Sequence, residues 1–575
     1  MSDYRAVYEL WANGEAFDKE TRDELLAISN DDKEIEERFF RDLEFGTGGL
    51  RGILGAGTNR MNIYTVRRAS QGMADYILAN EPSGKGKGVV IAHDSRRYSK
   101  EFAEQSALIF AQNGIKAYLF ESLRPTPLLS YSILQLGCIA GIVITASHNP
   151  KEYNGYKAYW AHGGQITPPQ DGEIINAINK ISDFSTLKVM DYDEAVAKGL
   201  LTVLDGSIDD KYIDEVLSCS HADEATKAAA KGLQIVYTPL NGAGNVFVRR
   251  ALQQAGFEAV HIVPEQEMPD PDFTTAPYPN PEDSATWKLA LELAKNKNAD
   301  IIIATDPDCD RTGVMAKDGD TYRLLSGNQT GVLFAHYILS SLKNNGKLPN
   351  NTAIVSTIVS TKMTEKIASA FGTSFYEVLT GFKYIGEKIT AWEQSGQHTF
   401  ILGFEESIGF LCGRYARDKD GVAAALLIAE VAAHYAARGL TLFDGLNELY
   451  DEYGYFIEGV KSLTFKGMTG LKDMERIMAG LRDNPPSDIG GRPVLQFRDY
   501  KLSLIDDLAN SQKLPIDLPK SDVLYFVLDD GWFCIRPSGT EPKIKIYFGV
   551  SKDTKAEAEA ALASLTDDVM AFLAI

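Results

Sequence analysis

The stretch AGIVITASHNP, residues 140–150, runs from an uninterrupted apolar segment directly into a short polar motif. An apolar segment without alternation predicts a strand that is buried on both faces. Further runs of this kind are each followed by a polar or glycine-rich loop and then by a helical pattern: KGVVIAHDSR, LQIVYTPLNGAGN, ADIIIATDPDCDR, NTAIVSTIVS and HTFILGFEES. Strands that alternate with helices predict α/β units with largely buried sheets. Ligands bind such sheets at the carboxyl ends of the strands, which is where the polar motifs lie.

The size and charge of the chain narrow the possible classes of function. A chain of 575 residues corresponds to about three to five domains. Hydrophobic residues make up 44% and charged residues 24% of the chain, as is usual for a protein with a sizeable core. The formal net charge is −21, from 58 basic and 79 acidic side chains, which argues against a nucleic-acid partner. A small phosphorylated ligand needs only a local basic pocket and stays compatible with this charge.

Several features favour a cytoplasmic protein without a membrane partner. The five cysteines are scattered and show no CxxC spacing, which indicates a reduced compartment rather than a disulfide framework or a zinc site. The N-terminus MSDYRAVYELWANGEAF has no basic segment followed by an apolar one, so we expect no signal peptide. The most apolar long stretch, residues 421–440, contains Glu430 and His434 and is too short to span a bilayer. It predicts a buried helix.

Two segments read as connections. Residues 183–210, DFSTLKVMDYDEAVAKGLLTVLDGSIDD, are rich in polar residues and predict a link between α/β units. Residues 264–283 are rich in Pro and Asp and predict a long loop inside the second unit.

The motif DPDCDR follows the strand-like run ADIIIA and places Asp306, Asp308 and Asp310 at alternate positions. In an extended segment this spacing puts three carboxylates on one side, where they repel unless a cation holds them. Oxygen ligands suit a hard ion, above all Mg²⁺. An EF-hand loop would need Gly and Glu where this chain has Arg311 and Lys317. A solvated acidic turn is the alternative.

The motif TASHNP raises the question of whether Ser147 is a hydrolase nucleophile with His148 as its base. Adjacent side chains tend to point apart, so the pair is a poor catalytic dyad. No G-x-S-x-G elbow surrounds the serine either. On this segment alone, a capping or turn serine is the other interpretation.

The motif RPSGTEPK, residues 536–543, has the composition of a phosphate-binding loop. An arginine fork, hydroxyl donors and a glycine that lets backbone amides approach an anion are the features such loops share. The residues concerned are Arg536, Ser538, Gly539, Thr540 and Lys543. A plain basic turn is the alternative.

Two weaker motifs complete the set. In GFEES, Glu405 and Ser407 alternate at a strand end, where a carboxylate and a hydroxyl can bind sugar hydroxyls, and Lys419 follows in RDKDG. A helix N-terminus with acidic residues would give the same pattern. In FGTGGLRG, four glycines surround Arg51, so a flexible loop that brings one arginine to an anion and a structural turn are equally compatible.

Together these motifs resemble the α-D-phosphohexomutase superfamily, the phosphoglucomutase/phosphomannomutase enzymes. TASHNP, DPDCDR, GFEES and RPSGTEPK occur in the family order and cover essentially the whole chain. The resemblance implies four domains around a central cleft. Three are related α/β domains with mixed sheets, and the last is an α+β phosphate-binding domain. We expect their limits at residues 1–205, 206–320, 321–445 and 446–575.

The resemblance also implies residue roles at the reacting centre. Ser147 would carry the phosphoryl group and, with Asp306, Asp308 and Asp310, hold Mg²⁺. Lys157, in NGYK, is the candidate proton carrier, with His148 and His93 as further candidates. Arg51 and Arg311 would lie close to the transferred group, and His148, which follows the phosphoserine, would help to position it or to neutralise its charge.

The remaining roles concern the sugar phosphate. Glu405 and Ser407 would read the sugar, and Thr380, Gly381 and Lys419 would line its pocket. The clamp for the phosphate that does not react would consist of Arg536, Ser538, Gly539, Thr540 and Lys543. Family members that act on both glucose and mannose carry Met and His where this chain has Glu406 and Gly409, so the resemblance favours glucose phosphates.

The implied activity is intramolecular phosphotransfer, an isomerase reaction. Glucose 1-phosphate and glucose 6-phosphate would interconvert through a phosphoserine enzyme and glucose 1,6-bisphosphate, which would also act as activator. The expected partners are small sugar phosphates, and the protein would be a monomer or small homo-oligomer. Pentose phosphate mutation, glucose-1,6-bisphosphate synthesis and phosphomannomutase activity are alternatives on the same scaffold. A serine hydrolase and a non-catalytic Ca²⁺- or sugar-phosphate-binding protein are alternatives of other classes.

Overall fold

The computed structural model describes residues 4–46, 48–465, 470–537 and 543–573. The chain divides into two compact units. The first contains residues 1–325, 385–403 and 407–441, and the second contains residues 326–384, 404–406 and 442–575.

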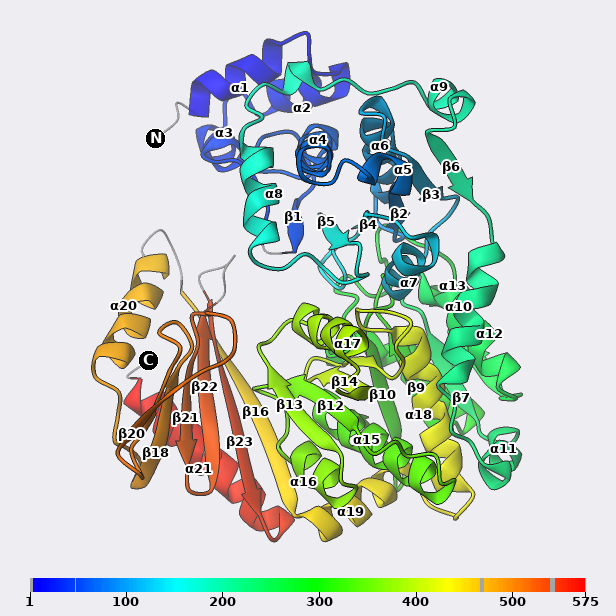
Figure 1. Ribbon diagram of the computed structural model, residues 1–575, viewed down its shortest axis with the longest axis vertical. Coiled ribbons are helices and arrows are strands. Elements are labelled where there is room, and N and C mark those ends of the chain that lie inside the picture. Colours follow the sequence, from blue (N-terminus) through cyan, green and yellow to red (C-terminus); the bar gives the residue numbers. More distant parts are fainter. Residues whose placement is uncertain (1–3, 47, 466–469, 538–542, 574–575) are drawn as a thin grey trace. The chain divides into compact units, whose positions relative to one another are not determined.

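The first sheet of the first unit is mixed and has the strand order β1-β5-β4-β2-β3-β6 (Figure 1). β4, β2, β3 and β6 run parallel, whereas β5 is antiparallel to both β4 and β1. β2 and β4 are buried at every position, as their unbroken apolar sequences predict. The strands are β1 (Gly49–Ile53), β2 (Val89–His93), β3 (Ala117–Phe120), β4 (Ala140–Ile144), β5 (Tyr153–Trp160) and β6 (Leu201–Leu204).

Helices pack on this sheet and on one another. α6 contacts β2 and β3, α7 contacts β2 and β4, and α4 packs against α6 and α8. The helices are α4 (Ile63–Asn80), α5 (Gly84–Lys87), α6 (Ser99–Gln112), α7 (Thr126–Leu136), α8 (Gln170–Asn179) and α9 (Tyr192–Ala197).

Three further helices precede the first strand, and no sequence motif predicted them. They are α1 (Tyr4–Asn13), α2 (Lys19–Ala27) and α3 (Asp32–Phe39). Trp11 stacks on Phe17 and meets Phe39 and Tyr64 edge to face, which ties the three helices to α4. Such aromatic pairs add to the stabilisation from burial alone.

The second sheet of the first unit is also mixed, with the order β11-β10-β9-β7-β8. β9, β7 and β8 are parallel, and β10 is antiparallel to both of its neighbours, β9 and β11. Its elements are α10 (Ser207–Ser218), α11 (Glu224–Ala230), β7 (Ile235–Thr238), α12 (Gly244–Gln254), β8 (Val260–Ile262), α13 (Pro264–Glu267), α14 (Lys288–Lys297), β9 (Ile301–Thr305), β10 (Thr312–Asp318) and β11 (Thr321–Leu325).

A third sheet has the order β13-β12-β14-β15, and the limit between the two units passes through β14. Its elements are α15 (Gly327–Asn344), β12 (Thr352–Thr357), α16 (Met363–Ala370), β13 (Ser374–Val378), α17 (Lys383–Ser395), β14 (Thr399–Glu405), β15 (Gly409–Leu411), α18 (Gly421–Ala436) and α19 (Leu442–Tyr453).

The C-terminal part of the second unit is an antiparallel sheet with the order β16-β23-β22-β21-β18-β19-β20, and β17 pairs with β18. α21 packs along β16 and β23 (Figure 1). The elements are β16 (Tyr455–Thr464), α20 (Gly470–Asp483), β17 (Asp488–Ile489), β18 (Arg492–Asp499), β19 (Leu504–Asp507), β20 (Gln512–Pro515), β21 (Leu524–Leu528), β22 (Gly531–Pro537), β23 (Lys543–Lys552) and α21 (Lys555–Phe572). The expected fold class, α/β domains followed by an α+β domain, is confirmed.

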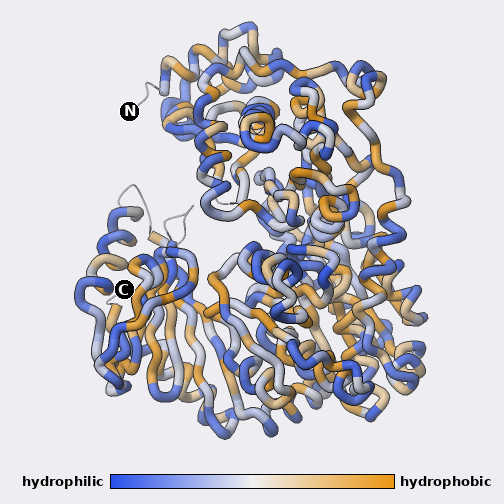
Figure 2. Tube along the Cα trace, in the orientation of Figure 1, coloured by the Kyte–Doolittle hydropathy of each residue, from blue (hydrophilic) through white to orange (hydrophobic). Residues whose placement is uncertain are grey.

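The structure confirms the predicted buried helix. α18 is hydrophobic along most of its length (Figure 2). It is buried at nearly every position. Within the described ranges, no helix combines the length and the apolar character needed to cross a membrane. The predicted polar connection, residues 183–210, contains α9 and the edge strand β6, which the sequence did not predict. β6 is only four residues long and polar residues flank it, so its sequence pattern is too weak to predict a strand.

Candidate active site

Ser147 follows the buried strand β4 and adopts an uncommon backbone conformation. Its φ is +52°, in the left-handed region that non-glycine residues seldom adopt. The side chain is only 3% exposed, and its Oγ donates a 2.6 Å hydrogen bond to Asp306 Oδ2. The sequence-predicted phosphoserine and the first predicted metal ligand are therefore in direct contact.

The three aspartates follow β9 and are fully buried or nearly so. One carboxylate oxygen of each lies within 4.8 Å of those of the other two. Asp306 Oδ1 accepts from the amides of Asp310 and Arg311, at 3.1 and 3.0 Å, which closes the loop around the first carboxylate. Gly242 lets this loop pack tightly, because a Cβ at that position would lie 2.5 Å from Pro307 Cα.

Two lysines neutralise the charge of Asp308 and Asp310, and a threonine donates a hydrogen bond to Asp308. Lys157, on β5, donates from Nζ to Asp308 Oδ2 at 2.7 Å and to Asp310 Oδ2 at 2.9 Å. Lys419 Nζ lies 3.2 Å from Asp310 Oδ2. Thr126, the first residue of α7, donates from its hydroxyl to Asp308 Oδ2 at 2.7 Å.

The oxygen atoms left over fit a hard cation. Among the residues that the structure describes, none offers a hydrogen bond to Asp308 Oδ1 or Asp310 Oδ1, although both atoms are buried. An unpaired buried carboxylate oxygen is costly unless a cation or proton satisfies it. All-oxygen ligands are the type that Mg²⁺ and Ca²⁺ prefer. The triad can therefore hold a metal ion.

The charged groups around the cluster shift the pKa values of Asp306 and Asp310 in opposite directions. Burial, together with the negative charges of Asp308 and Asp310, raises the pKa of Asp306 well above its usual range. Burial acts in the same direction on Asp310, but Lys157 and Lys419 outweigh it and lower the pKa of this carboxyl. Burial opposes the charge of Lys157, yet the two aspartates prevail and raise the pKa of its ammonium group. Lys157 is thus protonated at neutral pH.

His148 lies closer to Ser147 than the sequence suggested. Its Nδ1 is 3.1 Å from Ser147 Oγ, so the expectation that the two adjacent side chains point apart is wrong. The left-handed conformation of Ser147 turns the chain and brings the side chains to one side. Burial, followed by the charges of Arg311 and Arg51, lowers the pKa of His148 well below its usual value. The imidazole is neutral, and Asp306 remains the nearer partner of the hydroxyl.

The remaining predicted residues of the first unit lie at the margins of this cluster. Arg51, on β1, donates to Asn149 Oδ1 at 3.2 Å. Arg311 pairs with Glu282 at 3.3 Å, and its Nε is 3.9 Å from Asp310 Oδ1. His93 Nδ1 donates to the carbonyl of Asp94 at 2.9 Å.

The second unit contains the predicted sugar-reading carboxylate. Glu405, at the end of β14, accepts a 2.8 Å hydrogen bond from the amide of Gly381, which follows Thr380 after β13. The neighbouring Glu406 accepts from Thr357 Oγ1 at 2.8 Å. Burial and then Glu405 raise the pKa of Glu406. Ser407, the next residue, belongs to the first unit and lies in the turn before β15.

The predicted phosphate loop connects two neighbouring strands. Arg536 is on β22 and Lys543 begins β23, and these antiparallel strands pair with Pro537 opposite Ile544. Ser538, Gly539 and Thr540 lie outside the described residues.

Sequence reasoning missed two residues that support the site. Thr126 lies in RPTP, where nothing in the sequence indicates an aspartate partner 182 positions away. Arg96 lies in HDSRR after β2 and donates from Nη2 to the carbonyl of Ser147 at 2.6 Å. Its position after a strand end was an available signal.

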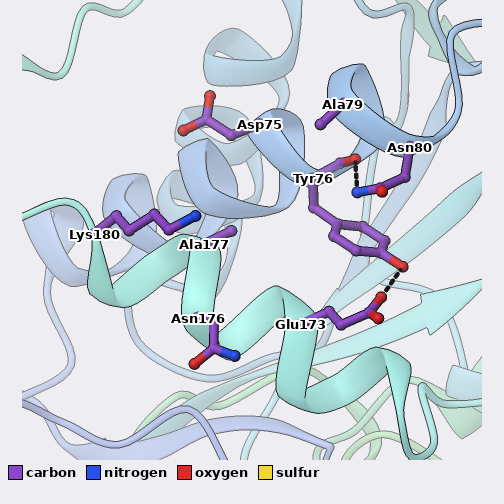
Figure 3. Close-up of a pocket in the computed structure, with 8 residues that line it drawn as sticks. All are labelled: Asp75, Tyr76, Ala79, Asn80, Glu173, Asn176, Ala177 and Lys180. Atoms are coloured by element: carbon purple, nitrogen blue, oxygen red, sulfur yellow. Dashed lines mark hydrogen bonds between the residues drawn. The ribbon is translucent and has the colours of Figure 1, made fainter.

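A surface pocket of about 410 Å³ elsewhere in the first unit contains none of the predicted site residues (Figure 3). Its lining comes from α4 and α8. Glu173, one of its charged residues, already accepts a 2.8 Å hydrogen bond from the Tyr76 hydroxyl. The pocket adds no chemistry to the site.

The chain matches models of one known protein family along most of its length. Models of the phosphoglucomutase/phosphomannomutase family match in sequence order: α/β/α domain I at residues 42–184, domain II at 210–319, domain III at 326–453 and the C-terminal domain at 494–565. The chain belongs to the phosphoglucomutase/phosphomannomutase family. It is therefore an isomerase of the phosphohexomutase class.

Curated relatives match along nearly the whole chain. A phosphoglucomutase of Staphylococcus saprophyticus is 33% identical, over 88% of this chain and 90% of the relative. The protein named "Probable phosphoribomutase" of Schizosaccharomyces pombe is 36% identical, over 92% and 91%.

Solved structures share the fold. A phosphoglucomutase/phosphomannomutase family protein from Burkholderia thailandensis superposes with a TM-score of 0.64 at 19% identity, over 91% of this chain and 95% of that chain. The open form of parafusin, a phosphoglucomutase from Paramecium, gives 0.66 at 17% identity, over 92% and 94%.

Proposed function

We propose that the protein is a phosphoglucomutase that interconverts glucose 1-phosphate and glucose 6-phosphate through a phosphorylated Ser147 and glucose 1,6-bisphosphate. The observation that carries the proposal is the 2.6 Å contact between Ser147 Oγ and the buried triad at Asp306. A hydrolytic serine donates its proton to a base, whereas here the hydroxyl donates to Asp306 at 2.6 Å, nearer than the neutral imidazole of His148 at 3.1 Å.

The proposed reaction is a relay in two transfers. The bond between phosphorus and Ser147 Oγ breaks as phosphorus bonds to the free hydroxyl oxygen of the hexose phosphate. The other phosphoryl group of the resulting bisphosphate then returns to Ser147. Phosphoryl transfer depends mainly on in-line positioning and charge neutralisation. Lys157 and Lys419, which bind the aspartate cluster beside the buried Ser147, would contribute neutralising charge.

Asp306, Asp308 and Asp310, together with Ser147, would hold Mg²⁺. When bound, this ion supplies positive charge beside the phosphoryl group on Ser147. The buried oxygens Asp308 Oδ1 and Asp310 Oδ1, which accept no hydrogen bond from any described residue, support this assignment.

We assign the proton movements to Lys157 and His148. Lys157 is charged and makes two bonds to the aspartates, so it can donate a proton to an oxygen that leaves phosphorus. His148 is neutral and lies 3.1 Å from Ser147 Oγ, which suits it to accept a hydrogen bond or a proton. Arg51 and Arg311 would stabilise negative charge on the transferred group.

The sugar-binding roles complete the proposal. Glu405, Ser407, Thr380, Gly381 and Lys419 would contact the sugar. Arg536, Ser538, Gly539, Thr540 and Lys543 would bind the phosphate that is not reacting. We further propose the four domain limits 1–205, 206–320, 321–445 and 446–575, with one motif from each domain. The contact between Gly381 and Glu405 supports the first group of roles.

A second candidate is pentose phosphate mutation by the same relay. The observation behind it is the relative named "Probable phosphoribomutase", which is 36% identical, beside staphylococcal phosphoglucomutases at 33% and 35%. Phosphomannomutase activity and glucose-1,6-bisphosphate synthesis are further alternatives. They change the sugar or the phosphoryl donor and leave the Ser147 relay unchanged.

The wider setting follows from the same proposal. We place the enzyme in the cytoplasm, with small sugar phosphates as its partners, as a monomer or small homo-oligomer. The five free thiols support a reducing compartment.

The test is a coupled assay of glucose 1-phosphate conversion with Mg²⁺, with and without a trace of glucose 1,6-bisphosphate. We expect activity that the bisphosphate stimulates and that EDTA abolishes. Ribose 1-phosphate in place of glucose 1-phosphate distinguishes the second candidate. Turnover that survives EDTA would contradict the metal-assisted relay.

A further inference from the structure

The serine loop, residues 147–153, connects β4 to the start of β5 and carries the reactive hydroxyl. Ser147 has a φ of +52°, a conformation that persists only where surrounding contacts enforce it. On the amide side, Ser147 N donates to Thr145 Oγ1 at 2.8 Å. The buried carbonyl of Ser147 also needs a hydrogen-bond donor.

Arg96 donates hydrogen bonds to the carbonyl of Ser147 and to three further carbonyls of the same loop. Its Nη2 donates to the carbonyls of Ser147, at 2.6 Å, and of Asn149. Its Nη1 donates to the carbonyls of Pro150, at 2.9 Å, and of Tyr153, at 3.1 Å. Each terminal nitrogen of a guanidinium group has two N–H donors, so all four are used on carbonyls of one loop.

The guanidinium group is itself held in place and shielded from solvent. The side chain of Arg96 is 0% exposed, and its Nε lies 3.3 Å from Asp94 Oδ2. The ring of Phe273 covers it, with the guanidinium carbon 4.9 Å from the ring centroid. Asp94 Oδ2 also accepts from Thr145 Oγ1 at 2.6 Å. One buried network therefore fixes both sides of the Ser147 backbone.

We propose that Arg96 is a positioning residue for phosphoryl transfer, because it fixes the serine loop so that Ser147 Oγ is directed at Asp306. The inference rests on the proposed function. Arg96 acts through the loop and not on the substrate, since it is buried and its terminal donors are engaged with backbone. Lysine cannot replace it, because three donors on one nitrogen cannot reach four carbonyls spread along the loop.

The test compares Arg96→Lys with Arg68→Lys in the mutase assay. Arg68 is a matched control, because it is buried in the same unit and binds Asp42 at 2.6 Å and the carbonyl of Ile178 at 3.3 Å. We expect Arg96→Lys to lower kcat about 100-fold, as a misplaced reacting group does. KM should change less than about threefold, because ground-state binding is retained. The control variant Arg68→Lys should have the kcat and KM of wild type.

A second readout does not depend on catalysis. Amide hydrogen exchange in a peptide that spans residues 145–154 should become about tenfold faster in Arg96→Lys, with the rest of the first unit unchanged. If Arg96→Lys does not fold, the pair Arg96→Gln and Asp94→Asn leaves no buried charge alone and is measured in the same two ways.

The outcomes are distinct. A folded Arg96 variant with unchanged exchange in the serine loop, or with kcat within about threefold of wild type, overturns the inference. A wild-type protein without turnover on any sugar phosphate overturns the proposed function instead. In that case the exchange measurement still decides whether Arg96 holds the loop.

Discussion

Ser147 Oγ and Asp306 Oδ2 lie 2.6 Å apart although 159 positions separate them in the chain. The contact joins the ends of two buried strands, β4 and β9, that belong to different sheets of the first unit. It places the nucleophile of the proposed relay against the first carboxylate of a cation site.

Removing one carboxylate should weaken metal binding before it affects the fold. In Asp308→Asn the amide retains the shape of the side chain but loses the charge that the predicted cation needs. We expect Mg²⁺ to bind at least about 100-fold more weakly. Titration of activity against Mg²⁺ measures this effect. Asp171→Asn, at a buried aspartate of α8 outside the site, should leave the Mg²⁺ dependence unchanged, and an equal shift in both variants would refute the assignment.

Gly409 leaves the space that Lys419 occupies. A Cβ at position 409 would lie 2.1 Å from Lys419 Cδ, so Gly409→Ala must displace this lysine from Asp310. We expect kcat/KM to fall about 10- to 100-fold, because a small misplacement in the site is costly. Steady-state kinetics checks this prediction. Gly172→Ala is the control, since its Cβ would meet no atom within 4 Å; equal losses in both variants would argue against a role for the displaced lysine.

Glu458 should make the stability of the second unit depend on pH. Burial raises its pKa from 4.5 to about 7, against hydrogen bonds from Thr361 and Asn328. The folded state then keeps a proton that the unfolded chain releases at lower pH. The stabilisation is complete below pH 4.5 and is lost as pH rises through about 7.

Between pH 5 and pH 8, wild type should therefore lose about 2 kcal/mol more stability than Glu458→Gln. Urea unfolding at the two pH values measures the difference. Glu475→Gln, at an exposed position of α20, should follow wild type. A Glu458→Gln variant with the wild-type pH dependence would show that this carboxyl is not the cause.

The sequence predicted those parts of the fold that depend on local pattern. The unbroken apolar runs became buried strands, and residues 421–436 of the apolar stretch 421–440 became α18, because burial on all sides is directly visible in the composition. The alternate aspartates converge as their spacing indicated. β6 was missed because its strand residues are few and its pattern is weak.

The supporting contacts of the site could not be predicted in the same way. Thr126 and Arg96 act through partners that only the tertiary structure brings near, 182 and 51 positions away. Neither residue differs in type from many others in the chain. The contact between Ser147 and His148 was missed for a different reason, since it depends on a left-handed backbone conformation that spacing rules do not anticipate.

The most direct test of the central claim is to treat dephosphorylated protein with glucose 1,6-bisphosphate labelled in its phosphoryl groups and to map the label by peptide mass spectrometry. We predict one phosphoryl group per chain, on Ser147, which glucose 1-phosphate then removes to give labelled bisphosphate. Ser147→Ala should take up no label and show no mutase activity. Label on another residue, or near-wild-type turnover by Ser147→Ala, would contradict the account.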